Sequence, residues 1–489
     1  MSKNYWWFEE SMEYPQNENF DPKVKYAEYP YTELQEKISM NGDNLVYEAI
    51  RDILKTEEFD GKKLGTGEWN PLGYCIVPGN TVLLKPNLVN SRNLTEEKNQ
   101  EYYHCTIVHP SIVRVIFDYV YIALKGEGKI IIADAPIQGC DFEKLLRDSG
   151  YGKLFQYFKE KETDSLKVDV ADLRDTIVYL ENGNKRQIDN KEKKYQGKVV
   201  DLGENSYFYN IRNKKNFRVT DYAAEDTVAH HSKGKNEYCV SEALLNADVV
   251  INIVKPKTHR IAGYTAALKN MIGINTRKEY LPHHQCGSKR TGGDEYIDSH
   301  LLLKFLNSRG NDVKNWALKR QYNHLSDVTN EFSRRIGRVL DHKETNRKKF
   351  GMWYGNDTIW RTILDVNHIV HYCDKTGIMQ KEKQRKVLHF GDMVVSGEKE
   401  GPLNPTYKKV GGILFSDNPV AFDLCVVKLM GFDYKKFPTL VNALKDQKLF
   451  NEKLGDIELH SNNEDFNKKL KSINKNFGFE PASGWREFL

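Results

Sequence analysis

The residues best suited to chemistry lie between Lys255 and His284. Within this stretch His259 precedes Lys269, and Lys269 is flanked in sequence by Ala, Leu, Met and Ile residues. Apolar surroundings lower the pKa of a lysine and make its amine a better nucleophile or base. Imidazole is the side chain that most often moves protons near neutral pH. We therefore predict that His259 and Lys269 are catalytic.

The segment between these two residues contains Gly263 and Thr265, a pattern that predicts a turn leading into a helix. Backbone N–H groups at the start of a helix attract anions. We expect Thr265 and the nearby Asn270 to contact an anionic or polyhydroxy substrate there.

Two adjacent imidazoles, His283 and His284, follow in a loop bounded by proline and glycine, and Asp294 lies shortly after them. Imidazole and carboxylate groups are common metal ligands. The spacing predicts a metal site at His283, His284 and Asp294, with proton transfer by the two histidines as the alternative. His109, at the start of an expected helix, is a further candidate for acid–base catalysis.

Three expected strands end in polar residues, which are Lys85, Asn87, Asp134 and Lys257. Ligands of open α/β sheets bind outside the carboxyl ends of the strands. We therefore expect these four side chains to share one site and to bind the substrate. Glu398, in a glycine-spaced acidic loop, would reach the same site as a base or a cation ligand.

Hydrophobic periodicity predicts an alternation of strands and helices. Buried strands are expected at residues 80–84, 129–134, 247–254 and 412–416, and helices at residues 44–55, 110–126, 141–150 and 419–431. This alternation implies parallel strands with helices on both faces. The predicted fold class is α/β, with parallel or mixed sheets and flanking helices, in two α/β lobes that hold the site between them.

The remaining segments divide the chain around this core. Residues 1–43 predict an irregular N-terminal arm, and residues 446–489 a polar C-terminal tail. The core, residues 44–445, carries a charged, β-prone insertion at residues 155–240 and a polar helical segment at residues 296–385. The best candidates for helices in that segment are residues 299–308 and 327–340.

Composition excludes several classes of function. The 73 basic and 68 acidic residues are scattered, which is not typical of a nucleic-acid interface. None of the seven cysteines forms a CxxC pair, so neither an iron–sulfur cluster nor a zinc ribbon is expected, and reduced thiols fit the cytoplasm. The sequence predicts no signal peptide and no transmembrane segment, and it gives no oligomeric state.

Taken together, these motifs resemble the family called domain of unknown function 362 (DUF362). The resemblance rests on residues 82–88, His109 with its helix, residues 129–134, residues 248–273, residues 397–403 and residues 415–431. Residues 281–295 resemble a subgroup associated with bacterial surface-polysaccharide gene clusters.

The chain is also distantly similar to lactate-racemase-type enzymes, which bind a nickel-pincer nucleotide. That similarity implies that His259 is an acid–base residue, that Lys269 tethers the cofactor, and that His283 or His284 binds nickel. The turn from Gly263 to Ala267 departs from the glycine pair that those enzymes have next to the lysine.

Three functions follow as expectations. The first is an isomerase or epimerase that acts on a sugar or hydroxy-acid derivative by histidine and lysine acid–base chemistry, with a divalent metal or a nickel-pincer-like cofactor as a candidate helper. The second is a transferase acting on phosphate-linked sugars in surface-polysaccharide synthesis, with a divalent ion on Asp294, Glu398 or Glu400. The third is a non-catalytic binding protein that uses an exposed arm with Trp6, Trp7 and Phe8.

Overall fold

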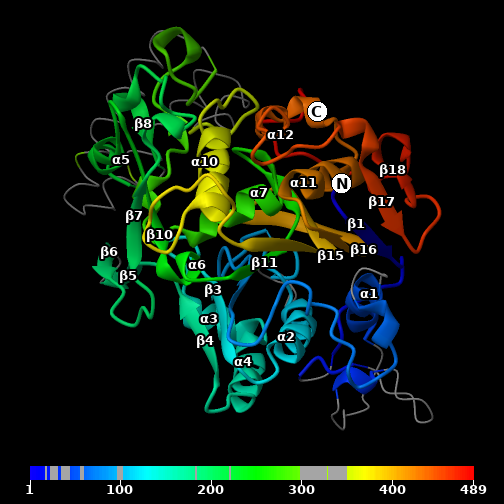
Figure 1. Ribbon diagram of the computed structural model, residues 1–489. Coiled ribbons are helices and arrows are strands. Elements are labelled where there is room, and N and C mark those ends of the chain that lie inside the picture. The colour runs from blue at the N-terminus through cyan, green and yellow to red at the C-terminus, as the bar shows by residue number, and fades with distance from the viewer. Residues whose placement is uncertain are drawn as a thin grey trace.

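The fold is known from a computed structural model of the chain (Figure 1). The part of the chain that it describes consists of residues 1–16, 19–22, 31–34, 44–55, 60–95, 103–181, 184–219, 222–297, 316, 328 and 350–489.

One mixed sheet forms the centre of the molecule. The strands from β15 to β4 run parallel, whereas β16 is antiparallel to both β15 and β1. In order across the sheet the strands are β18 (Lys468–Lys469), β17 (Glu458–Ser461), β1 (Asn4–Phe8), β16 (Asn404–Ser416), β15 (Lys386–Glu400), β11 (Val249–Val254), β2 (Thr81–Pro86), β3 (Gly128–Asp134) and β4 (Leu166–Asp172).

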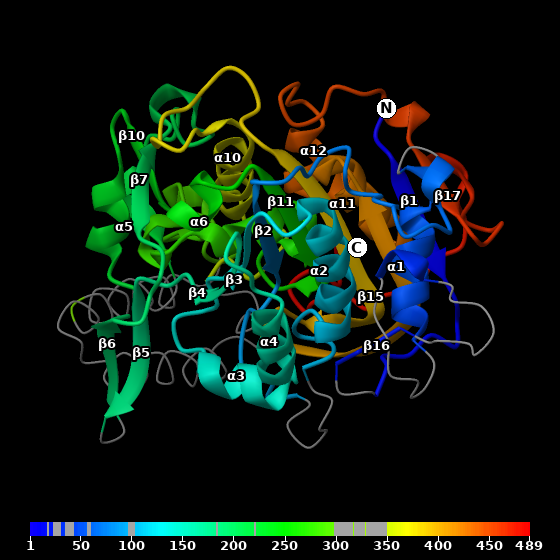
Figure 2. The same cartoon turned by 60° about the horizontal axis from the view of Figure 1, so that its bottom comes forward.

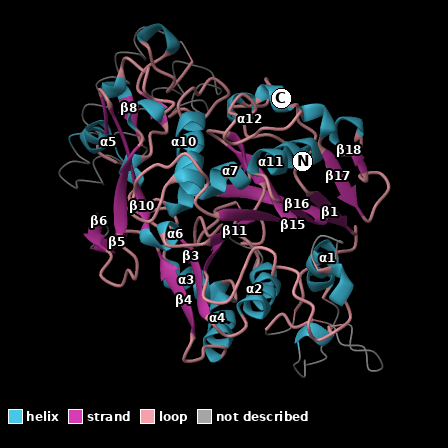
Figure 3. Cartoon of the chain, in the orientation of Figure 1, coloured by secondary structure: helices cyan, strands magenta, loops and turns pink. Residues whose placement is uncertain are grey.

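Helices cover both faces of this sheet (Figures 1 and 3). One face carries α1 (Leu45–Leu54), α2 (Pro110–Leu124), α3 (Phe142–Asp148) and α4 (Tyr151–Glu160). The other face carries α6 (Glu242–Leu245), α7 (Ala267–Asn270), α10 (Ile359–Tyr372), α11 (Pro419–Met430) and α12 (Pro438–Ala443).

The two faces have separate hydrophobic cores because successive side chains of a strand point in opposite directions. In β2, Leu83 belongs to the core under α10 and α11, whereas Val82 and Leu84 belong to the core under α2. The predicted α/β class with flanking helices is therefore confirmed. In place of two separate lobes, the two halves of the molecule are layers on one shared sheet.

Local signals explain where the main helices begin. Asn44 caps α1 by accepting a hydrogen bond from the Tyr47 N–H, and Asn418 caps α11 in the same way. Pro110 and Pro419 occupy first turns, where the missing N–H of proline leaves no bond unmade. Gly431 ends α11 in a left-handed conformation.

The sequence predicted an irregular arm at residues 1–43, but part of this segment is a strand. β1 lies inside the sheet, antiparallel to β16 and parallel to β17 (Figure 2). Trp6 is fully buried against Phe466 and Phe477. The predicted C-terminal tail likewise supplies β17 and β18, so both ends of the chain build one edge of the sheet.

The predicted β-prone insertion is confirmed as rich in strands, but it is not separate from the core. Its first strand, β4, completes the central sheet. Its other elements are α5 (Ala224–His230), the hairpin of β5 (Thr176–Glu181) and β6 (Asn184–Asp189), the small sheet of β7 (Gly197–Asp201), β10 (Lys235–Ser241) and β9 (His231–Ser232), and β8 (Phe217–Arg218), which pairs with β14 (His284–Gln285).

The helical segment predicted at residues 296–385 is described only in part. The candidate helices at residues 299–308 and 327–340 lie outside the described residues, apart from residue 328. The described helix of this segment is α10. None of the helices in the described ranges is long and apolar enough to cross a membrane.

Replacing Trp6 with alanine tests the place of β1 in the core. Because Trp6 is fully buried, Trp6→Ala should lower the free energy of unfolding by about 3–5 kcal/mol. Leu94→Ala is the control, since Leu94 is 64% exposed and its loss should change stability by less than about 0.5 kcal/mol. Urea unfolding curves measure both. Equal midpoints for the two variants would contradict the buried position of Trp6.

Candidate functional site

The candidate site lies at the carboxyl ends of the parallel strands β2, β3 and β11. Just beyond the end of β11, β12 (Lys257–His259) and β13 (Gly263–Thr265) form a short hairpin. The chain then continues through α7 and a 3-10 turn at Met271–Ile274 to a second 3-10 turn at Lys278–Tyr280. The sequence predicted these strand ends as the place of the site, because ligands of open α/β sheets bind there.

The side-chain amide of Asn270 joins α7 to two strands. Its Oδ1 accepts hydrogen bonds from Asn87 Nδ2 at 2.7 Å and from Lys85 Nζ at 3.3 Å. Its Nδ2 donates to Asn252 Oδ1 at 2.7 Å and to the carbonyl of Ile253 at 3.2 Å. Asn270 is buried, so its polar atoms are satisfied by the protein itself, and its role is to position α7.

Lys85 and Asp134 form an ion pair, with 2.7 Å between Nζ and Oδ1. Both are buried, and Asp134 also accepts a hydrogen bond from the backbone N–H of Leu88. Burial lowers the pKa of Lys85, and the charge of Asp134 opposes that effect. Gly273 packs directly against the pair, so a Cβ there would lie 2.1 Å from Asp134 Oδ1. These two predicted substrate-binding residues are thus occupied with each other.

Lys257 is buried at the start of the hairpin. Its amine donates hydrogen bonds to Asn87 Oδ1 at 3.0 Å and to the carbonyl of Thr106. Burial, together with the positive charge of Lys255, lowers its pKa to about 7. Asn87 is partly exposed and joins Lys257 to Asn270, since its Nδ2 donates to Asn270 Oδ1.

Lys269 has an amine with no hydrogen bond or ion pair to any residue within the described ranges. The side chain is partly exposed, while its surroundings are apolar enough that burial lowers its pKa to about 8. A substantial fraction of this amine is therefore uncharged in mildly alkaline solution. The predicted loss of solvation at Lys269 agrees with this environment.

The hydrogen bonds of His259 define which of its ring nitrogens carries the proton. Nδ1 accepts from the backbone N–H groups of Ile261 at 3.0 Å and Ala262 at 3.2 Å. An accepting nitrogen carries no hydrogen, so the proton of the neutral ring is on Nε2. Burial, followed by the charge of Lys269, holds the pKa of His259 well below its usual value. His259 is therefore a neutral donor.

His283 has the opposite arrangement. Its Nδ1 lies 2.6 Å from the carbonyl oxygen of Leu281, which can only accept, so Nδ1 carries the hydrogen and Nε2 presents a lone pair. Burial, followed by the charge of Lys269, lowers the pKa of His283 to about 4. His283 also lowers the pKa of His259, which shows that the two rings and Lys269 share one environment.

Thr265 faces Lys257 in the register of the β12–β13 hairpin and is buried at the base of the site. Its hydroxyl makes no hydrogen bond to any residue that the structure describes. The hydroxyl is thus available to a ligand, and the contact of Thr265 with a substrate stays a prediction.

The expected anion site at the start of α7 is not formed, because a carboxylate already occupies it. Asp423 of α11 accepts hydrogen bonds from the N–H groups of Ala267 at 2.7 Å and Leu268 at 3.3 Å. It also accepts from the Tyr264 hydroxyl at 2.9 Å. Burial raises the pKa of Asp423 to about 7. Asp423 therefore fixes the segment between His259 and Lys269.

His109 serves the core instead of the site. Its Nδ1 caps α2 by accepting from the Ser111 N–H, and its ring stacks on Tyr14 with 3.9 Å between centroids. Tyr14 belongs to the core on the α2 face, whereas Ile261 and Ala262 beside His259 belong to the other core. The predicted catalytic role of His109 is therefore not supported by its position.

The three predicted metal ligands do not gather into a metal site. Asp294 accepts hydrogen bonds from the Gln285 N–H, the Asp357 N–H and the Thr358 hydroxyl, which braces the loop. His284 is buried in β14, next to the ring of Phe350. Within the described ranges, no group of three or more His, Cys, Asp or Glu residues is placed to hold a metal ion.

The acidic loop after β15 is also engaged elsewhere. Glu398 accepts a hydrogen bond from the Glu480 N–H at 2.9 Å and lies 3.5 Å from Lys408 Nζ. Glu400 pairs with Arg260 at 2.8 Å. Neither carboxylate is bonded to the network of Asn270.

Sequence reasoning missed Asp423 and Lys278. Asp423 lies within a strongly apolar helix, where a single carboxylate is a signal for a buried partner. Lys278 stands in a charged turn and carries no local signal. Among the described residues its amine donates to two backbone carbonyls, those of Ala135 and Asn275.

Gly273→Ala tests whether the close approach of Gly273 to the ion pair matters. The added Cβ must displace Asp134 or Lys85, so the free energy of unfolding should fall by about 1–3 kcal/mol. Gly139→Ala is the control, because a Cβ at Gly139 meets no atom within 4 Å. Thermal and urea unfolding of the two variants measure the difference. A Gly273→Ala protein as stable as the control would contradict the packing described here.

Comparisons with known proteins place the chain in a family. No curated protein matches it. A crystal structure of a protein from Thermotoga maritima is similar at 10% identity and a TM-score of 0.26, over 68% of this chain and 51% of that one, so the chain spans about half the length of that protein. The profile of the family described as "Domain of unknown function (DUF362)" matches residues 82–182 and 173–428. The match covers more than half of the chain, which therefore belongs to the DUF362 family.

Proposed function

We propose that this protein is an isomerase or epimerase that moves a proton at a carbon next to a carbonyl group of a small anionic sugar or hydroxy-acid derivative. One observation carries the proposal. A neutral imidazole that donates, a neutral imidazole that accepts and an unpaired amine with a pKa of about 8 share one environment at the strand ends.

In this proposal His259 binds the carbonyl oxygen. Its Nε2–H would donate a hydrogen bond to that oxygen and strengthen it as negative charge develops in an enolate. A neutral imidazole suits this role, because it donates without transferring its proton. The two backbone N–H groups on Nδ1 keep the donating tautomer in place.

Lys269 is the proposed base. Its uncharged amine would take the proton from the carbon next to the carbonyl, and the resulting ammonium would return a proton to the same carbon or to its neighbour. The C–H electron pair moves into the enolate and back, so the step needs no oxidant or reductant. His283 Nε2 would accept a hydrogen bond from a substrate hydroxyl and orient the chain of the substrate.

The charge of the site supports an anionic substrate. Lys257, Lys269 and Lys278 form no ion pair with a carboxylate in the part of the chain that the structure describes. Three amines without an ion-pair partner favour an anionic ligand, because a nearby anion would offset the burial that lowers their pKa values.

The residues also fit in part the nickel-pincer-like cofactor that the distant resemblance implies. Lys269 has a free amine for a tether, and His283 Nε2 has a free lone pair for a metal. His284 and Asp294 do not fit, because they are packed or bonded within their own loop. Such a group would supply a hydride acceptor.

The other two functions have less support. The carboxylates expected to hold a divalent ion for a transferase, Asp294, Glu398 and Glu400, are engaged with other partners. The arm expected to serve a binding protein is partly built into the sheet as β1. A role in surface-polysaccharide synthesis fits a sugar derivative as substrate, and the cytoplasm, where seven free thiols stay reduced, is the proposed location.

Proton exchange in D2O tests the proposed reaction. Gluconate, 6-phosphogluconate, lactate and ribose 5-phosphate are the probes, and NMR follows deuterium entering next to the carbonyl or carboxylate. Exchange should rise as Lys269 loses its proton near pH 8, whereas binding should weaken as Lys257 loses its charge near pH 7. The rate constant kcat/KM should therefore peak between about pH 7 and 8.

Lys269→Gln is the matched variant for this test. Exchange should fall by about 10²–10⁴-fold, while the Tm stays close to that of the wild type because the amine bonds to no described residue. Exchange that survives in Lys269→Gln, or a large loss of Tm, would reject Lys269 as the base.

Intact-protein mass spectrometry separates a free base from a tethered cofactor. The proposal of proton transfer expects an unmodified Lys269 and exchange that resists treatment with a chelator. A covalent adduct on the wild-type protein that is missing from Lys269→Gln, together with bound nickel, would overturn the role of Lys269 as a base and favour the cofactor.

A further inference from the structure

Lys278 is a cation of the site that takes no part in the proposed proton transfer. It follows the 3-10 turn at Met271–Ile274 and is partly exposed. Its amine donates to the carbonyl of Ala135 at 2.8 Å and to that of Asn275 at 3.2 Å. Ala135 directly follows β3, so the amine is held at the same strand ends as the rest of the site. Two bonds leave the third N–H of the ammonium for another acceptor.

Three cations near Lys278 form ion pairs, whereas Lys278 forms none with any residue that the structure describes. Lys85 pairs with Asp134 at 2.7 Å, and Arg277 pairs with Asp175 at 3.3 Å. Arg174, which adds to the positive charge around Lys278, is itself bonded to Asp172. The Lys278 amine is held by carbonyl oxygens and has no carboxylate partner among the described residues. Such an amine is suited to bind an anion.

The position of Lys278 differs from that of Lys269. Both amines lower the pKa of His283, so both lie close to that ring. The charges that act most strongly on Lys278 are those of Asp134 and Lys85, whereas Lys269 acts on His259 and Lys257. The amine of Lys278 is thus held next to the end of β3, apart from the residues on which Lys269 acts.

We propose that Lys278 binds a second anionic group of the substrate, at the end away from the carbon that reacts. The substrate class is then a hydroxy-carbonyl compound with a phosphate at its far end, such as a phosphorylated sugar acid. A phosphate carries about −1.5 to −2 charges at pH 7, which suits an amine that has no ion-pair partner among the described residues. This inference rests on the proposed function for the identity of the reacting end.

Burial supports the same assignment. It lowers the pKa of Lys278 to about 7, so the free protein holds this amine partly uncharged near neutral pH. An anion beside the amine favours the charged form and raises its pKa. Binding of the second anionic group should therefore take up a proton.

Matched pairs of ligands test the second anion site by isothermal titration calorimetry at pH 7. Gluconate carries one anionic group, 6-phosphogluconate adds a phosphate, and glucarate adds a carboxylate instead. The wild-type protein should bind 6-phosphogluconate at least about tenfold more tightly than gluconate, which is a typical gain for one charge-assisted contact. Glucarate shows whether a carboxylate can replace the phosphate.

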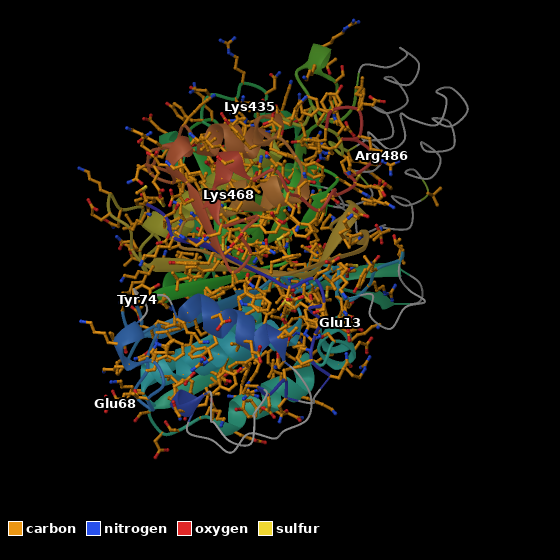
Figure 4. The ribbon with its side chains drawn as sticks, turned by 90° about the vertical axis from the view of Figure 1, so that its right-hand side faces the viewer. Glu13, Glu68, Tyr74, Lys435, Lys468 and Arg486 are labelled. Carbon is orange, nitrogen blue, oxygen red and sulfur yellow. The ribbon has the colours of Figure 1, made fainter. Side chains whose placement is uncertain are left out.

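Three variants locate the effect. Lys278→Gln should lose the preference for 6-phosphogluconate and keep the affinity for gluconate, whereas Lys278→Arg should keep the preference. Lys435→Gln removes one lysine charge from an exposed position on the C-terminal layer and should change nothing (Figure 4).

The outcomes separate this inference from the proposed reaction. A preference for 6-phosphogluconate that is absent in the wild type, or unchanged in Lys278→Gln, overturns the second anion site. Failure of all three ligands to bind the wild type also counts against it. Selective binding without deuterium exchange would instead reject the proposed reaction and leave the anion site standing.

Discussion

The side chain of Asn270 is the interaction on which the site depends. A single amide accepts from Lys85 and Asn87 and donates to Asn252 and the Ile253 carbonyl, so it ties α7 to β2 and β11. Asp423 holds the other end of the same short segment through the N–H groups of Ala267 and Leu268. Lys269 lies between these two anchors. Its neighbours make the hydrogen bonds that fix the segment, and its own amine makes none to a described residue.

The low polarity of the strand ends sets the chemistry that is available. Burial keeps His259 and His283 neutral, and their opposite tautomers turn two identical side chains into a donor and an acceptor. The same burial brings the amines of Lys257, Lys269 and Lys278 to pKa values of about 7 to 8. Where an acid is at hand, as Asp134 is for Lys85, the charge is internal. Lys257, Lys269 and Lys278 have no such carboxylate partner among the described residues.

Local sequence patterns predicted most helices and strands of the core, but they could not predict hydrogen bonds between residues that are distant in the sequence. The apolar run of Val249–Val254 and the Asn-Pro start of α11 are visible in the sequence, and so is the convergence of strand ends that brings Lys257 near Lys269. The partners of Asp423 and the hydrogen bonds of the Lys278 amine could not be predicted from the sequence. In the sequence, Lys278 stands between Arg277 and Glu279 and resembles one charge of a solvated turn. The pairing of Arg277 with the distant Asp175 becomes known only from the folded structure.

The place of β1 has a consequence for how the protein is made. Asn4 and Ser416, whose side chains are hydrogen-bonded, are separated by 412 positions. A ribosome that adds about 5–20 residues per second needs roughly 20–80 s to synthesise that interval. Trp6 and its neighbours therefore leave the ribosome long before their partner strand β16 is synthesised, and they remain unpaired during that time. This edge of the sheet therefore forms only after β16 and β17 have been synthesised.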